Sequence, residues 1–246
     1  MLDRLAPPTA AGIDGCRAGW LCVTETGNSL RAFVAPDIAQ LVQQLPTDAL
    51  IGIDIPIGLP LADSRQCDLE ARKLLGRRGV SVFPAPLRAT IEGTSNATPY
   101  ARVHELQRQH HARGKGLSQQ AWRLLPKIRE IDAFMHEDLS RAERIVEVHP
   151  EVSFYFWNGE APLPQSKKSR EGRAARARLI DALWPGIRAE LLQELKANHR
   201  AAFAEDDFID AFAALWSMRR HRSRTSITLP ARVEADSTGL PQQIVA

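Results

Sequence analysis

The stretch Ala11-Gly12-Ile13-Asp14-Gly15-Cys16 places one carboxylate inside a short apolar segment, which predicts a buried strand. An ionised Asp in such a strand costs several kcal/mol unless a partner compensates its charge. Glycines on both sides of the acid remove side-chain bulk, so a ligand could approach the backbone closely. The arrangement recurs in Leu50-Ile51-Gly52-Ile53-Asp54-Ile55-Pro56. Because lone acids are an unusual way to build a core, we expect these two to meet around a metal ion.

Length and composition fit an ordinary globular protein. The chain has 246 residues, of which 44% are hydrophobic and 25% charged, enough for one large domain or one domain with a long insertion. The sequence contains no apolar run long enough for a membrane span, and its N-terminus lacks the pattern of a secretory signal. Cys16, Cys22 and Cys67 have no paired spacing, which argues against a disulfide framework or a cysteine-rich zinc site. We therefore expect a cytoplasmic protein.

The N-terminal part of the chain predicts three strands, a helix and a fourth strand. Apolar runs predict the strands at 11–16, 20–25, 30–34 and 50–55, and short connections make the first three an antiparallel meander. Helical spacing predicts a helix from Pro36 to Pro46. The fourth strand is nearly all apolar, as expected of a strand that is covered on both faces.

A long region without strand signals follows. We expect a helix over 65–76 capped by Asp63-Ser64, a second over 98–111, and a third after Ser118 with a kink or break at Pro126. These segments predict a helical insertion at about 60–140, which would form the wall or lid of a site.

The remaining chain predicts a fifth strand at 144–149, helices at 172–183, 187–197 and 206–220, and an irregular tail. Together with the earlier elements, residues 1–246 are predicted to form a single α/β domain.

Five acids are placed so that the predicted fold could bring them together. Packed carboxylates raise one another's proton affinity, and a divalent cation removes that conflict. Mg²⁺ and Mn²⁺ prefer oxygen ligands, and two such ions about 4 Å apart support phosphodiester cleavage. The candidate catalytic residues are Asp14, Asp54, Glu147, Asp207 and Asp210, of which Asp14, Asp54, Asp207 and Asp210 are the candidate ligands of Mg²⁺ or Mn²⁺.

Structural interpretations of these acids stay open. Asp14 and Asp54 could accept hydrogen bonds from backbone donors at strand ends, and acids at a helix start favour the helix dipole. The sequence does not decide which of Glu147 and Glu151, or of Asp206 and Asp207, faces the site.

Basic residues are candidates for holding phosphate groups. Lys167, Lys168, Arg173 and Arg176 form either a phosphate clamp or a solvated segment. The candidate substrate-binding residues are Lys127, Arg129, His149, Lys168 and Arg173.

Seven motifs occur in order along residues 12–220: Gly12-Ile-Asp-Gly-Cys-Arg-Ala-Gly-Trp20, Ile53-Asp-Ile-Pro-Ile-Gly58, Arg65-Gln-Cys-Asp68 with Ala71-Arg72, Ser81-Val-Phe83, Pro126-Lys-Ile-Arg-Glu-Ile-Asp132, Glu147-Val-His-Pro-Glu151-Val-Ser-Phe154 and Asp206-Asp-Phe-Ile-Asp-Ala211. Together they resemble the family called domain of unknown function 429, a predicted ribonuclease H-like nuclease.

This resemblance implies a ribonuclease H-like mixed sheet of five strands, three antiparallel and then parallel, flanked by helices and with a helical insertion after strand four. It assigns the acid of the first strand to Asp14 and that of the fourth strand to Asp54. The late-helix pattern Asp207-x-x-Asp210-Ala-x-Ala resembles the junction-resolving branch, in which both acids bind metal. Glu147 has no firm counterpart in the better known branches.

The expected activity is metal-dependent hydrolysis of phosphodiesters in nucleic acid or another phosphorylated substrate. One alternative is a non-catalytic module that binds metal, a phosphorylated ligand or nucleic acid, and the net charge of +3 fits this module better than a broad nuclease. A second alternative is an actin-like phosphotransferase, because Asp14-Gly15 resembles the phosphate loop of those enzymes. Such folds need a second half with its own sheet, however, and the sequence predicts only one clear strand there. The sequence leaves the substrate, the choice of DNA or RNA, and the oligomeric state open.

Overall fold

The computed structural model describes residues 9–199 and 201–246, which divide into two compact units. The first, here called the sheet unit, comprises Met1–Asp54, Arg144–Ser226 and Val245–Ala246. The second, here called the helical unit, comprises Ile55–Glu143 and Ile227–Ile244. The expectation of a single domain over 1–246 stays a prediction.

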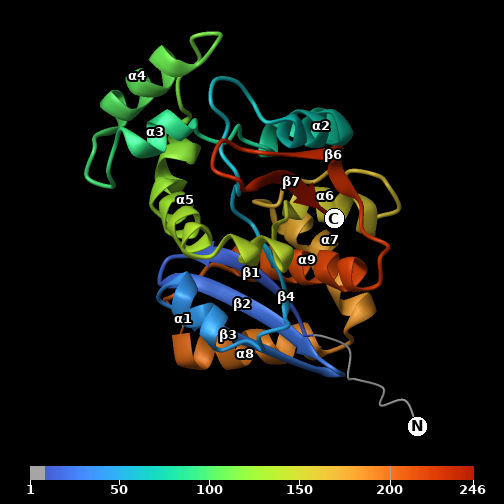
Figure 1. The fold of residues 1–246 in the computed structure, drawn as a ribbon. Coiled ribbons are helices and arrows are strands. Elements are labelled where there is room, and N and C mark those ends of the chain that lie inside the picture. Colours follow the sequence, from blue (N-terminus) through green and yellow to red (C-terminus); the bar gives the residue numbers. More distant parts are fainter. Residues whose placement is uncertain (1–8, 200) are drawn as a thin grey trace. The chain divides into compact units, whose positions relative to one another are not determined.

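The sheet unit is built on five strands in the order β3-β2-β1-β4-β5 (Figure 1). The strands β1 (Ala10–Cys16), β2 (Gly19–Thr26) and β3 (Ser29–Ala35) pair antiparallel. In contrast, β4 (Leu50–Ile53) pairs parallel with β1, and β5 (Ile145–Glu147) pairs parallel with β4. The predicted mixed sheet is therefore confirmed, including its three antiparallel strands followed by parallel ones.

Five helices of the described residues belong to the sheet unit: α1 (Ile38–Gln43), α6 (Pro150–Trp157), α7 (Arg170–Leu183), α8 (Ile187–His199) and α9 (Glu205–Arg222). Side chains cap the N-termini of α1 and α7. Asp37 accepts a hydrogen bond from the Gln40 N–H, and Ser169 accepts one from the Gly172 N–H. The longest of these helices, α9, lies against β1, β2 and β4 (Figure 1).

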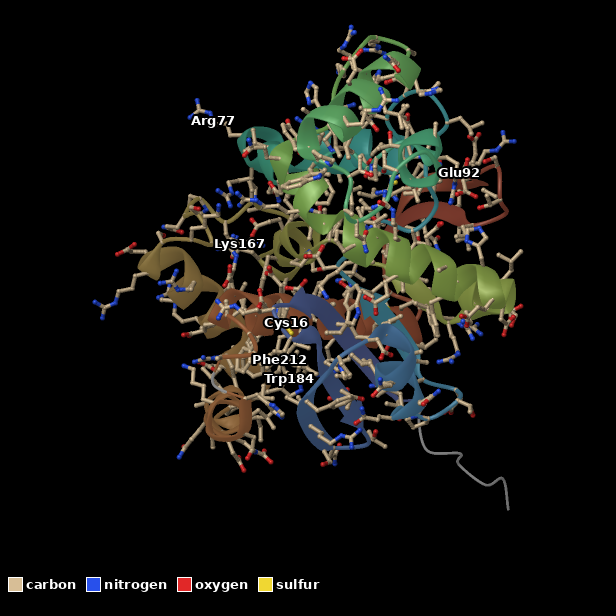
Figure 2. The ribbon with its side chains drawn as sticks, turned by 90° about the vertical axis from the view of Figure 1, so that its left-hand side faces the viewer. Cys16, Arg77, Glu92, Lys167, Trp184 and Phe212 are labelled. Atoms are coloured by element: carbon tan, nitrogen blue, oxygen red, sulfur yellow. The ribbon has the colours of Figure 1, made fainter. Side chains whose placement is uncertain are left out.

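The core between α9 and the sheet is apolar and rich in aromatic residues. Leu21 and Val23 of β2 pack in one cluster with Phe208 and Phe212 of α9. Phe212 also contacts Trp184, with ring centroids 5.4 Å apart, and both are labelled in Figure 2. This packing fixes the position of α9 on the sheet, because buried side chains in a close-packed core cannot shift independently.

The helical unit contains α2 (Gln66–Leu75), η1 (Gly76–Ser81), α3 (Arg88–Glu92), α4 (Tyr100–His110), α5 (Gln119–Glu137), η2 (Leu139–Glu143), the strand β6 (Thr228–Ala235) and all but the last residue of β7 (Pro241–Val245). The helical insertion expected after strand four is therefore present between β4 and β5. No helix of the described residues is long and apolar enough to cross a membrane.

Three local expectations differ from the structure, two of them in full and one in part. The chain end is not irregular, because β6 and β7 pair in a two-stranded sheet. Helix α5 runs through Pro126, so the break that was one of the two alternatives there does not occur. Helix α2 has no side-chain cap, because Asp63 instead accepts a hydrogen bond from the N–H of Ser64.

Candidate metal centre

Strand pairing places Asp14 and Asp54 side by side. Ile13 of β1 is paired with Ile53 of β4, and each acid is the next residue of its chain. The Asp54 N–H donates to the Ile13 carbonyl at 3.0 Å, which continues the ladder to the acids. Because parallel strands end at the same edge of a sheet, both carboxylates emerge at one edge.

Two glycines bring α9 close to these strands. A Cβ at Gly12 would lie 2.1 Å from the Ala211 carbonyl oxygen, and one at Gly52 would lie 3.2 Å from the Ala214 carbonyl oxygen. Gly12 therefore serves the close approach of a helix, where the sequence suggested the approach of a ligand. Since side chains alternate along a strand, Asp14 and Asp54 share the face of Gly12 and Gly52 and point toward α9.

The close approach of α9 adds a third acid, Asp210. One carboxylate oxygen from each of Asp14, Asp54 and Asp210 lies within 4.8 Å of the other two. Asp14 is held in place by its own turn, because its Oδ1 accepts a hydrogen bond from the Gly15 N–H at 2.7 Å. Asp210 is only 2% exposed, and its buried Oδ1 has no hydrogen-bond partner among the described residues. We call these three residues the acid triad.

A lysine lies against the triad. Lys167 precedes α7, and its Nζ donates to Asp210 Oδ2 at 2.6 Å (labelled in Figure 2). Its side chain is 32% exposed, whereas the Asp210 side chain is 3% exposed. Lys168 was the predicted phosphate contact and Lys167 was left undecided, since neighbouring lysines in a polar loop carry no signal that distinguishes them.

The electrostatics of the triad favour bound protons or a cation. Desolvation by burial, followed by the charges of neighbouring acids, raises the pKa of Asp14 well above its usual value. Burial also raises the pKa of Asp54, to about 8, and that of Asp210. The Lys167 charge opposes all three shifts, and in return Asp210 raises the pKa of Lys167. One lysine therefore only partly offsets the charge of three acids.

The other predicted acids lie near the triad but are arranged differently. Asp207 accepts a hydrogen bond from the Ala204 N–H at 2.8 Å, so it caps α9, and burial raises its pKa to about 6. Glu147 is buried at the end of β5 and raises the pKa of Asp54. Neither belongs to the group of oxygens within 4.8 Å of one another. Glu151 is bound by the buried Arg176, so Arg176 is neither a phosphate clamp nor solvated.

The predicted substrate contacts are spread over both units. Lys127 and Arg129 lie on α5 in the helical unit, where Arg129 donates to Asn96 at 3.1 Å. His149 precedes α6, and its carbonyl accepts a hydrogen bond from the Ser153 N–H. Lys168 is exposed, and Arg173 donates to the Lys168 carbonyl at 2.7 Å. Their roles in substrate binding stay predictions.

The triad is suited to a hard divalent cation. All three donors are carboxylate oxygens, the type of ligand that Mg²⁺ and Mn²⁺ prefer. The partnerless Oδ1 of Asp210 is a buried acceptor that a bound cation would satisfy. The three carboxylates therefore fit a bound Mg²⁺ or Mn²⁺ ion in donor type and in charge.

Comparison with known proteins places the chain in a family. A search of curated proteins and a search of solved structures each gave no match. A family model, in contrast, matches residues 12–235, which include all three acids of the triad. The chain belongs to the family described as "Protein of unknown function (DUF429)".

Proposed function

We propose that this protein is a divalent-metal-dependent nuclease that hydrolyses phosphodiester bonds. The observation that carries the proposal is the acid triad, in which one carboxylate oxygen from each of Asp14, Asp54 and Asp210 lies within 4.8 Å of the others. Acids at such distances in a largely buried site repel one another, so the protein maintains an arrangement that lowers its own stability. Such conflicts are concentrated at functional sites.

Each acid has a defined part in the proposed site. Asp14, Asp54 and Asp210 would hold Mg²⁺ or Mn²⁺, which when bound supplies a Lewis acid for the phosphoryl oxygen and lowers the pKa of an attacking water. Asp207 and Glu147 would keep the region around the triad negative, through their charge interactions with Asp14 and Asp54 respectively. Asp207 also keeps the start of α9 in place by capping it.

Cleavage of labelled single-stranded and double-stranded DNA and RNA would test the proposal. We expect cleavage in Mg²⁺ or Mn²⁺ and none in EDTA. Asp14→Asn, Asp54→Asn and Asp210→Asn should each lower the rate at least about 100-fold, because each removes one charged ligand at the reacting phosphate. The substrate that is cleaved fastest would decide between DNA and RNA.

Asp48→Asn is the matched control, because Asp48 is an exposed residue in the loop before β4. This variant should cleave at the wild-type rate. Cleavage that survives Asp14→Asn or EDTA would rule out the proposed site. Saturable Mn²⁺ binding without turnover on any of the four substrates would instead favour the binding module.

A further inference from the structure

The ammonium of Lys167 binds the same carboxylate that would ligate a metal at the acid triad. Lys167 Nζ lies 2.6 Å from Asp210 Oδ2, and the same carboxylate contributes to the acid triad. The partner is almost fully buried, whereas about a third of the lysine side chain is exposed. A divalent cation on Oδ1 and an ammonium on Oδ2 of the same carboxylate would lie within a few ångströms of each other, and in a partly desolvated site they would repel each other strongly.

The lysine is also positioned so that it can leave. It lies in the segment between α6 and α7, where residues 158–169 contain no helix or strand. Its side chain donates a hydrogen bond to Asp210 and is 32% exposed. Because Lys167 lies outside every helix, a change of rotamer can break this contact without unfolding one.

Two exposed arginines of α7, Arg170 and Arg178, line a hollow of about 360 Å³ together with Gln165, Glu171 and Ala174. Arg170 is three residues from Lys167 in the chain. An anionic ligand that enters this hollow would meet the positive charge of both arginines.

We propose that Lys167 partly neutralises the acid triad when no divalent cation is bound. When the cation binds, the lysine is displaced from Asp210 and then binds a phosphate group of the substrate. This inference rests on the proposed function. It makes Lys167 a substrate-binding residue that becomes available only once the metal site is filled. It also explains why one carboxylate of the triad is neutralised by a lysine on a loop and not by a rigid arginine.

The first test is Mn²⁺ affinity, measured by isothermal titration calorimetry on the metal-free protein. Lys167→Met should bind Mn²⁺ about tenfold more tightly than the wild type or better, because no ammonium has to be displaced. Lys167→Gln should show the same gain, and it serves if Lys167→Met does not fold. Lys167→Arg keeps the charge and should bind Mn²⁺ no more tightly than the wild type.

The matched control for metal affinity is Lys168→Met. It makes the same change one residue away, on an exposed side chain, and should leave the Mn²⁺ dissociation constant within about twofold. If both lysine variants tightened Mn²⁺ binding equally, a general loss of positive charge would explain the gain and the proposal would be overturned.

The second test uses adenosine 5′-monophosphate as the phosphate probe. The Mg²⁺-saturated wild type should bind it, and the metal-free wild type should not. Lys167→Met saturated with Mg²⁺ should bind it at least about tenfold more weakly, because a charge-assisted contact is lost. If Lys167 had only a structural role, Lys167→Met would not bind Mn²⁺ more tightly and the nucleotide more weakly at the same time.

Different results would overturn the proposed function and the role of Lys167. If the wild type and Asp14→Asn bind Mn²⁺ equally or not at all, the proposed function fails. If the wild type binds Mn²⁺ through Asp14 but Lys167→Met binds neither Mn²⁺ more tightly nor the nucleotide more weakly, only the assignment of Lys167 fails. A change in one affinity without the other also overturns it.

Discussion

Arg176 Nη2 donates to both carboxylate oxygens of Glu151, at 2.5 and 2.7 Å, and neither side chain is more than 4% exposed. The same guanidinium donates to the carbonyl of Gly172 at 2.9 Å and to that of Gln165 at 3.3 Å. Arg176 thus joins α6, α7 and the segment that leads to Lys167. The pair is a structural support of the candidate site.

Arg176→Met should therefore destabilise the protein by about 3–5 kcal/mol, because it leaves a buried carboxylate without its counter-charge. Urea unfolding followed by circular dichroism would measure this loss. Arg188→Met is the comparison, since the pair of Arg188 with Asp181 is partly exposed and should cost less than about 1 kcal/mol. Similar losses in the two variants would contradict the structural role of Arg176.

Gly12→Ala should destabilise the sheet unit strongly. The added Cβ would lie 2.1 Å from both the Ala211 carbonyl oxygen and the Leu215 nitrogen, and backbone atoms of a helix cannot yield as a flexible side chain can. We expect a loss at or above the upper end of the usual range for overpacking, about 3 kcal/mol. Thermal unfolding would measure it.

Gly27→Ala is the control for this substitution. Gly27 lies in open space, so its only penalty is the left-handed backbone, with φ of 60°. It should cost roughly 1 kcal/mol. If Gly12→Ala were equally mild, α9 could not lie as close to β1 as described.

Asp236 should give part of the helical unit's stability a dependence on pH. Its carboxylate accepts hydrogen bonds from Thr238, from the Leu59 N–H and from Arg88, and these lower its pKa to about 2 although burial opposes the shift. A depressed folded-state pKa stabilises the protein above the unfolded-state value near 4, and this stabilisation is lost as the pH falls toward 2.

Asp236→Asn should accordingly cost about 2 kcal/mol at pH 7, and the difference from the wild type should shrink between pH 4 and pH 2. Unfolding in urea at a series of pH values would measure this. A difference that stayed constant down to pH 2 would show that the loss comes from packing and not from charge.

Asp54→Asn should have opposite effects on stability and on metal response. Burial and nearby acids raise the pKa of Asp54 to about 8, so its ionised form is unfavourable in the folded protein. A neutral amide removes that conflict, and we expect a gain of about 1 kcal/mol or more at pH 8 in EDTA. The rise in melting temperature that Mn²⁺ gives the wild type should be lost in the variant. Destabilisation in EDTA would show that Asp54 has a structural role.

Much of the sheet could be predicted because its signals are local. Ile13 and Ile53 each belong to a short apolar run that ends in an acid, so two neighbouring strands with Asp14 and Asp54 at the same edge followed from the pattern and the connections. The C-terminal hairpin could not be predicted in this way. Five of the eight residues of β6 are exposed and Pro230 interrupts the run, so no buried face gives the sequence a period of two.

The acids of α9 show where sequence reasoning becomes ambiguous. Asp207 and Asp210 share a helix face by their spacing, but Asp207 is in the first turn, where its carboxylate reaches the Ala204 N–H of its own helix. Asp210 is one turn further along the helix, and its carboxylate lies close to those of Asp14 and Asp54. Only the placement of α9 on β1, which depends on Gly12, separates the two roles. The contact of Lys167 was equally hidden, since Lys168 has the same chemistry and the same sequence neighbourhood.

The order of the segments in the sheet unit has a consequence for protein synthesis. Asp14 and Asp54 leave the ribosome early, whereas Asp210 follows only after the whole helical insertion has been made. Domains generally fold as units during translation, and this one cannot close before α9 emerges. A nascent or prematurely terminated chain would therefore carry Asp14 and Asp54 without the third acid of the triad.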